Sequence, residues 1–446
     1  AEVTEIADAY NEPGRFTALI GYEWTSIPAG ANLHRVILTD GDAASAQQFV
    51  PRTAPENNHP ESLWLWLNEV AAKTGDDFIS IPHNSNISRG FMFPTDKQLS
   101  GEPIDREWIE LRARWEQVVE VTQIKGDSET HPSLSPDDPF ADFEDYPYII
   151  SPRPIPYEPT VADFARSALR TGLQLEQRFG ANPYRFGMIG ATDSHTGLAT
   201  AEEPNFWGKF PTDATLQAKM KSAGDIENFG WVISASGLAG VWARDNTRES
   251  IMQAFKRREV YATTGPMIGV RVYAGSDLPT SLDAVTDPAA LAEMAVPMGG
   301  ELSALEMSPT FYIEASKDPR SAHLDRIQVI KGWLEGETTR EKVYDVAWAG
   351  AREPGLDGIV PAVTDTVDPD SGSYSNEHGE PTLSTLWRDP DFDPGQPAFY
   401  YVRVLEIPTP RHSTLDAIAL GMRPEKTGQP VSIQERAYTS PIYYRP

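Results

Sequence analysis

Gly187-Met188-Ile189-Gly190-Ala191-Thr192-Asp193-Ser194-His195 is the stretch that decides the fold class. Its apolar start predicts a short buried strand. The strand leads into Asp193 and His195, two side chains of the kind that bind metal ions. Because the carboxyl ends of the strands form the active-site rim in parallel α/β folds, this stretch predicts both a strand and a site.

Further apolar runs predict buried parallel strands at residues 16–22, 36–38, 78–81, 118–121 and 186–189. Helical spacing of apolar residues predicts helices at residues 61–73, 161–179 and 247–258. Thr247 is the expected N-cap of the last of these helices. Alternation of strands and helices predicts an α/β fold with a parallel sheet or a barrel over residues 1–266.

Polar side chains follow several of the predicted strands. They are Glu23, His83, Asn84 and Glu120. The chain holds eight histidines, and His34, His83 and His195 lie at or near predicted strands of this half. A lone histidine after an apolar run is more often a hydrogen-bonded structural residue, so the interpretation rests on the whole set. With no cysteine in the chain, imidazoles and carboxylates are the side chains that would bind a divalent transition metal.

One polar loop, after the strand at 118–121, allows two interpretations. It contains Lys125, Asp127, Glu129 and His131. In the functional interpretation Lys125 and Asp127, with Asn84, bind an anionic substrate, while Glu129 or His131 transfers protons. In the structural one the loop is simply hydrogen-bonded. The proline-rich sequence that follows, at 132–159, is typical of a lid or binding loop.

After residue 266 helical periodicity nearly disappears. Short apolar runs separated by Gly, Pro and Asp predict strands at residues 268–273, 310–315, 326–333 and 399–405. We therefore expect residues 267–446 to form a β-rich, sandwich-like region, either as a second domain or packed tightly on the first. Arg403 and Arg411 in this half, like Arg153 in the first half, could contact an anion, but each is expected to be a structural ion-pair partner instead.

The composition excludes several classes of function. The formal net charge of −27, from 65 acidic and 38 basic residues, disfavours binding to nucleic acid. No apolar run approaches the roughly 18–20 residues of a membrane span. No glycine-rich nucleotide-binding loop follows a predicted strand, and neither Ser85 nor Ser194 lies in a Gly-x-Ser-x-Gly turn.

Several stretches together carry a resemblance to a known family. They are Leu19-Ile20-Gly21-Tyr22-Glu23-Trp24, Ile81-Pro82-His83-Asn84, the stretches at 122–131 and 187–197, and the stretch at 401–410. In these the chain resembles the PHP (polymerase and histidinol phosphatase) superfamily of metal-dependent hydrolases, and most closely a branch of long, exported bacterial proteins of unassigned function. The resemblance implies a distorted (βα) barrel that holds two or three divalent metal ions, with Zn, Mn and Fe as the candidates.

The resemblance also implies roles for single residues. Glu23 matches the carboxylate that bridges two metal ions, and His34, His83, Asp193 and His195 match further ligands. The His-x-His motif with which such proteins begin is absent, since the first histidine is His34. We therefore expect only the latter strands of the barrel in this chain, and an N-terminal segment that is missing, separate or cleaved.

The function that these observations predict is metal-dependent hydrolysis of a phosphate ester, in which a metal-bound hydroxide attacks a small anionic substrate. A sulfate ester or an amide could be cleaved at the same site. A non-catalytic protein that binds a glycan or polymer, with a degenerate barrel, is the alternative from another class. The family resemblance implies a periplasmic or secreted protein.

Overall fold

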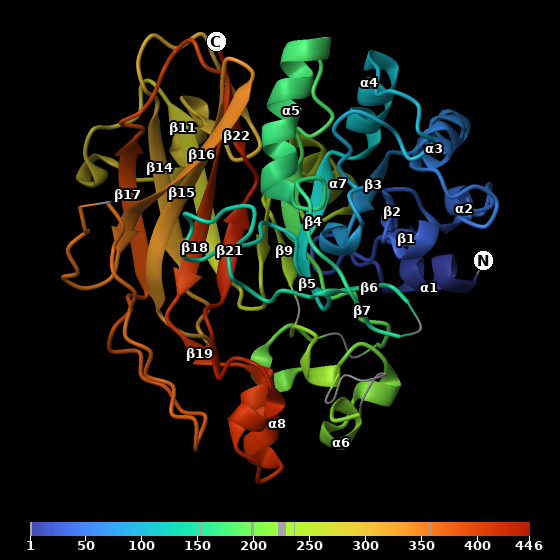
Figure 1. Cartoon of the computed structure of the whole chain (residues 1–446). Helices are drawn as coiled ribbons and strands as arrows, with labels where there is room; N and C mark the ends of the chain where they lie inside the picture. The colour runs from blue at the N-terminus through green and yellow to red at the C-terminus, as the bar shows by residue number, and fades with distance from the viewer. Residues whose placement is uncertain (1, 152, 198–199, 222–228, 236, 357) are drawn as a thin grey trace.

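The computed structural model describes residues 2–151, 153–197, 200–221, 229–235, 237–356 and 358–446 (Figure 1). The fold is mixed α/β with several sheets. Its helices are α1 (Glu2–Tyr10), α2 (Ala43–Ala46), α3 (Pro60–Thr74), α4 (Arg106–Trp115), α5 (Ala165–Phe179), α6 (Leu216–Lys219), α7 (Arg248–Arg257) and α8 (His412–Ala419). None of the described helices has the length and apolar character needed to cross a membrane.

The first sheet is antiparallel, and here the predicted parallel arrangement is wrong. It has three strands in the order β1 (Ile20–Trp24), β2 (Arg35–Thr39) and β3 (Phe78–Pro82), and both pairings are antiparallel. The connection from β1 to β2 contains only the short 3-10 turn Pro28–Gly30. A parallel pair needs a longer crossover, usually through a helix, so this connection permits only the antiparallel pairing.

The parallel pairing that the sequence predicts occurs between β4 (Val118–Gln123) and β8 (Gly187–Gly190). The long crossover between them contains α5, as a parallel connection requires. β5 (Gly126–Asp127) pairs with the other edge of β4. The described strands form separate sheets and no closed barrel, so the barrel part of the fold prediction is not supported.

The second half is rich in strands, as predicted. The large sheet contains eight strands, which are β9 (Leu238–Val241), β10 (Val260–Thr263), β13 (Glu301–Ser303), β15 (Leu324–Glu335), β16 (Thr338–Trp348), β18 (Ala398–Glu406), β21 (Arg436–Thr439) and β22 (Ile442–Arg445). The smaller sheet contains β12 (Val296–Pro297), β11 (Gly269–Gly275), β14 (Thr310–Ser316) and β17 (Thr382–Arg388). Short two-stranded pieces are β6 (Tyr148–Ile149) with β7 (Ile155–Pro156) and β19 (Thr409–Pro410) with β20 (Ser432–Ile433).

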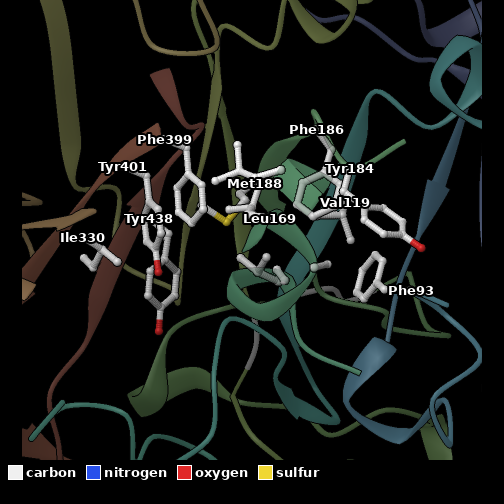
Figure 2. Packing of buried hydrophobic residues seen from close by; sticks show 14 of the residues in the cluster. Phe93, Val119, Leu169, Tyr184, Phe186, Met188, Ile330, Phe399, Tyr401 and Tyr438 are labelled. Carbon is white, nitrogen blue, oxygen red and sulfur yellow. The ribbon is translucent and has the colours of Figure 1, made fainter. Parts of the chain in front are cut away.

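The two halves of the chain share a sheet and a core. β9 and β10 precede residue 266 yet belong to the large sheet, since β10 pairs with β21. Figure 2 shows Leu169 and Met188 between Phe93 on one side and Phe399 with Tyr401 on the other. Each such fully buried side chain stabilises the fold by about 1.5–3 kcal/mol. The β-rich region is thus packed tightly on the first half.

Local signals account for the helix boundaries. Thr247 caps α7, as predicted, because its side chain accepts a hydrogen bond from the Ser250 backbone N–H at 3.2 Å. α5 begins at Ala165, later than the predicted residue 161. The reason is the Asp163 carboxylate, which accepts hydrogen bonds from Thr160 and holds this segment in a turn.

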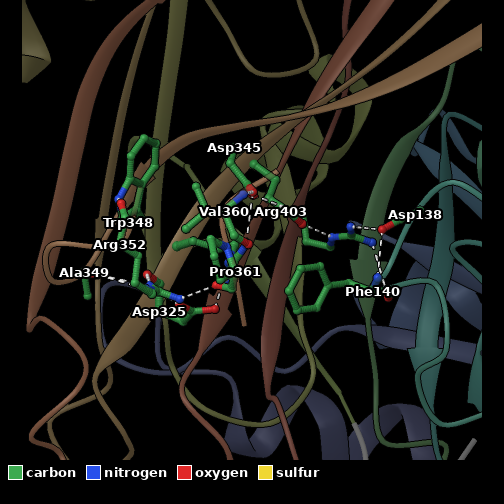
Figure 3. A network of polar contacts seen from close by, with 12 residues as sticks. Asp138, Phe140, Asp325, Asp345, Trp348, Ala349, Arg352, Val360, Pro361 and Arg403 are labelled. Carbon is green, nitrogen blue, oxygen red and sulfur yellow. Dashed lines mark hydrogen bonds and ion pairs between the residues drawn. The ribbon is translucent and has the colours of Figure 1, made fainter. Parts of the chain in front are cut away.

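Buried ion pairs fasten the first part of the proline-rich segment to the β-rich half. Figure 3 shows Arg403 of β18 reaching Asp138 and Phe140 of that segment. Arg403 Nη2 lies 2.7 Å from Asp138 Oδ1, and Arg166 of α5 lies 2.8 Å from Asp138 Oδ2. Arg403 is therefore a structural ion-pair partner, as predicted.

Candidate metal centre

Glu23, His34 and His83 meet at one edge of the first sheet. Glu23 lies near the end of β1, His34 directly precedes β2, and His83 directly follows β3. The antiparallel register places the end of β1 beside the start of β2, and that start beside the end of β3. Glu23 Oε1 lies 2.7 Å from His34 Nδ1 and 3.1 Å from His83 Nε2. The antiparallel sheet thus produces the cluster that a parallel sheet was expected to produce.

Asp193 and His195 form a second group with the same glutamate. They follow β8, and the ligand atoms of Glu23, Asp193 and His195 all lie within 4.8 Å of one another. Asp193 has a left-handed backbone, with φ 47°, and His195 Nε2 lies 3.3 Å from Asp193 Oδ1. Glu23 belongs to both groups, which is the position of a carboxylate that could bridge two ions.

The donor atoms in the first group fit a metal ion. Around a tetrahedral zinc ion, ligand atoms are about 3.3 Å apart, given metal–ligand distances of about 2.0–2.1 Å. The separations of 2.7 and 3.1 Å between Glu23 and the histidine nitrogens need only small outward shifts to reach that value. The nitrogens that face Glu23 are His34 Nδ1 and His83 Nε2, while the opposite ring nitrogens, His34 Nε2 and His83 Nδ1, are buried without a hydrogen-bond partner among the described residues. Nitrogen and carboxylate donors suit Zn, Mn or Fe, and the geometry does not choose among them.

The pKa values of Glu23, His34 and His83 depend on burial and on the contacts among the three side chains. Burial opposes ionisation of Glu23, but the hydrogen bonds from His34 and His83 outweigh it and hold the pKa of Glu23 below its usual range. Burial also lowers the pKa of His34, which favours the neutral imidazole that metals bind. For His83 burial acts in the same direction, yet the neighbouring carboxylates, above all Glu23, raise its pKa.

Two lysines approach the far oxygen of Asp193. Lys125 Nζ and Lys209 Nζ both contact Asp193 Oδ2, and Gln123 Nε2 donates to the same oxygen at 2.9 Å. Burial and the charge of Lys209 lower the pKa of Lys125 to about 8, although Asp193 opposes this shift. The sequence predicts Lys125 as a site residue but not Lys209, which lies in a loop without any motif.

Glu120 is a further group beside the cluster to which the sequence interpretation assigned no role. It lies in β4, is only 4% exposed, and has Oε1 without a hydrogen-bond partner among the described residues. Burial raises the pKa of Glu120 to about 7, against the charge of His83. Its position after the two valines of a predicted strand already marked it among the polar side chains of this half, and this is the signal that could have assigned it a role.

The predicted substrate-binding residues Asn84 and Asp127 lie in different surroundings. Asn84 follows His83, is fully buried in a left-handed conformation, and neither end of its amide has a described hydrogen-bond partner. Asp127 accepts a hydrogen bond from the Tyr438 hydroxyl at 3.0 Å, which directs it toward the β-rich half. The role of each in substrate binding stays a prediction.

The structure brings Lys125 to the cluster but places Glu129 and His131 elsewhere. Glu129 is buried against Arg166, whose Nε lies 2.7 Å away, and against the Tyr401 hydroxyl. His131 Nε2 lies 3.4 Å from Asp145 Oδ2. These contacts are typical of structural residues, and the catalytic roles of Glu129 and His131 stay predictions.

Comparison with known proteins adds a family but no activity. A family described as "Protein of unknown function (DUF3604)" matches residues 1–446. The chain belongs to this family. No curated protein and no solved structure matches it. The function of this DUF3604 chain is therefore inferred from the chemistry of its site.

A cavity of about 580 Å³ opens beside the cluster of this DUF3604 protein. His34, Lys125 and Lys209 line it together with the hairpin of β6 and β7. The hairpin packs closely on the turn before β2, where a Cβ on Gly30 would lie 3.1 Å from Ile149 Cδ1. The proline-rich segment is thus firmly placed over the site at this point, and its role as a lid stays a prediction.

A buried ion pair holds in place the part of the chain that directly precedes this hairpin. Arg411, just before α8, binds Glu144 through Nε at 2.6 Å and Nη2 at 2.8 Å. The paired contact resists rotation because both guanidinium nitrogens bind the same carboxylate. Arg411 is thus the structural ion-pair partner that the sequence predicts.

Proposed function

We propose that this chain is a metal-dependent hydrolase that cleaves a phosphate ester. The observation that carries the proposal is the position of Glu23, which contacts His34 and His83 and also groups with Asp193 and His195. These residues come from segments that are far apart in the sequence. Convergence of imidazoles and carboxylates on one carboxylate is the arrangement expected of a centre with two ions.

The residues of the cluster form two candidate ion sites that share Glu23. Glu23, His34 and His83 would hold one ion, and Glu23, Asp193 and His195 would hold another. When bound, such ions polarise an ester and activate water for attack. Lys125 and Lys209 lie on the Asp193 side, where their ammonium groups can bind the oxygens of an anionic ester.

Glu120 is the candidate for proton transfer in this arrangement. In the chain without metal ions, burial raises its pKa to about 7, so its carboxyl group is partly protonated near neutral pH. A buried acid of this kind can hold a proton at Oε1, the atom that lacks a hydrogen-bond partner among the described residues.

A phosphate ester is the substrate class that fits the charges and the family resemblance together. Asp193 balances one of the two ammonium charges of Lys125 and Lys209, so the pair leaves one positive charge for the oxygens of an anionic ester. The resemblance to the PHP superfamily supports the same reaction and includes the distorted barrel as part of the proposal.

Metal content and turnover test the proposal together. The full chain is loaded with Zn²⁺, Mn²⁺ or Fe²⁺, bound metal is measured by elemental analysis, and hydrolysis of phosphate mono- and diesters is followed. We expect His83→Ala and His195→Ala each to lose bound metal and turnover. His378→Ala removes an exposed histidine and should change neither. A wild-type chain that binds no metal and cleaves no phosphate ester would contradict the proposal.

A further inference from the structure

The cavity beside the candidate metal centre is positively charged, although the chain has a formal net charge of −27. Lys125, Lys209 and Lys221 line it, and no acidic residue among those that the structure describes does so. Asp193, which does not line the cavity, contacts Lys125 and Lys209 and balances one of their charges, so the lysines of the wall keep a net positive charge. A cavity with walls of one sign concentrates the opposite ion even when the whole protein repels it. The cavity therefore suits an anionic head group.

The rest of the cavity wall is largely apolar and aromatic. The hairpin contributes Ile149 and Ile150, and the segment after α6 contributes Phe229 and Ile233. Tyr146 stands edge-on to Phe229, with their ring centres 6.5 Å apart. Such a wall offers few partners to a ligand rich in hydroxyl groups, which would lose its hydrogen bonds to water on entering.

The cavity also has the size of a small-molecule site. Its volume of about 580 Å³ falls within the roughly 300–1,000 Å³ typical of ligand pockets. Aromatic rings in the wall favour an aromatic ligand, because ring pairs in edge-on or offset contact attract one another. Phe210 stands 5.1 Å from the His195 ring, so aromatic surface continues up to the candidate metal ligands.

We propose that the substrate is an aryl phosphate monoester whose ring occupies this cavity while Lys125 and Lys209 bind its phosphate. This assignment rests on the proposed hydrolase function and narrows it. In the reaction, water adds to phosphorus and the bond between phosphorus and the aryl oxygen breaks. Inorganic phosphate leaves, and a proton ends on the phenol oxygen.

Binding of phosphonates tests the assignment. A phosphonate is not hydrolysed, so its affinity does not depend on how readily a leaving group departs. The metal-loaded full chain is titrated calorimetrically with phenylphosphonate and with methylphosphonate. Burial of the ring predicts binding of phenylphosphonate that is about tenfold to a hundredfold tighter. Equal affinities, or no binding of phenylphosphonate at millimolar concentration, would overturn the assignment.

Two variants of the hairpin locate the ring. Ile149→Asp introduces a charge into the cavity wall and should bring the affinity ratio between the two phosphonates close to one. Ile155→Asp changes the same hairpin at a side chain that is 48% exposed and does not line the cavity, so the ratio should persist. A preserved ratio in Ile149→Asp would place the ring elsewhere and refute the assignment.

Turnover separates this assignment from the function on which it rests. Tight phenylphosphonate binding without hydrolysis of any phosphate ester would refute the hydrolase and leave the ligand class standing. Hydrolysis of glycerol phosphate, together with equal binding of the two phosphonates, would support the hydrolase and refute the aryl preference.

Discussion

Asp138→Asn should strongly destabilise the fold, because Asp138 neutralises two buried cations. Its carboxylate lies 2.7 Å from Arg403 and 2.8 Å from Arg166. Without its charge, both guanidinium groups share mainly Glu129, to which Arg166 is bound at 2.6 Å and Arg403 at 3.6 Å. Removal of one partner from a buried ion pair costs about 3–5 kcal/mol, and we expect a loss of this size in the free energy of unfolding.

Denaturant titration and hydrogen exchange measure this loss. Asp138→Asn should unfold at a lower denaturant concentration, and the amides of the first part of the proline-rich segment, around Asp138, should exchange faster. Asp137→Asn is the matched control, because Asp137 is the exposed neighbour in the sequence. If the two variants unfold at the same midpoint and exchange alike, the ion-pair network does not hold this segment.

The same carboxylate predicts a dependence on pH. Burial favours neutral Asp138, yet Arg403 and Arg166 outweigh it and hold the pKa of Asp138 well below its usual range. A pKa lower in the folded than in the unfolded state, where it is about 3.9, stabilises the protein above that pH. The difference between wild type and Asp138→Asn should therefore be constant from about pH 5 to 8 and shrink below about pH 4. A difference that grows on acidification would refute this reasoning.

Three further changes have smaller expected effects. Thr247→Ala removes the N-cap of α7 and should lower the free energy of unfolding by about 1 kcal/mol, measured by denaturant titration. Gly30→Ala places a side chain at φ 84° against the hairpin and should cost about 1–2 kcal/mol in the same assay. Lys209→Met removes a cation from the cavity and should weaken phenylphosphonate binding about tenfold in calorimetry, as expected for one charge-assisted hydrogen bond. An unchanged free energy of unfolding in Thr247→Ala or Gly30→Ala would contradict the cap or the close packing on the hairpin, respectively. An unchanged affinity in Lys209→Met would contradict the contact between Lys209 and the phosphonate.

The sequence predicted most elements whose signals are local. The helix α3 spans Pro60–Thr74 against the predicted 61–73, and Thr247 caps α7 as expected. The predicted strands after residue 266 correspond to β11, β14, β15 and β18. These signals are the spacing of apolar residues and the chemistry of the cap, and both act within a few residues along the chain.

The candidate site was predicted in part for the same reason. Ligand-type side chains at strand ends identified Glu23, His34 and His83, and the structure brings them together. Lys209 was missed because it lies in a loop and reaches Asp193 only through the folding of the chain. Glu129 was included because it is polar and near Lys125 in sequence, although its contacts lie with Arg166.

The sequence by itself determined part of the secondary structure, such as α3, α7, β11 and β14, and which side chains can bind a metal, since residue type and spacing encode both. Only the tertiary structure decided that the first sheet is antiparallel and that β9 and β10 join the sheet of the second half. Strand direction and partners depend on connections and on burial against distant surfaces. The same applies to the positive cavity, whose lysines come from separate loops and converge only in the folded chain.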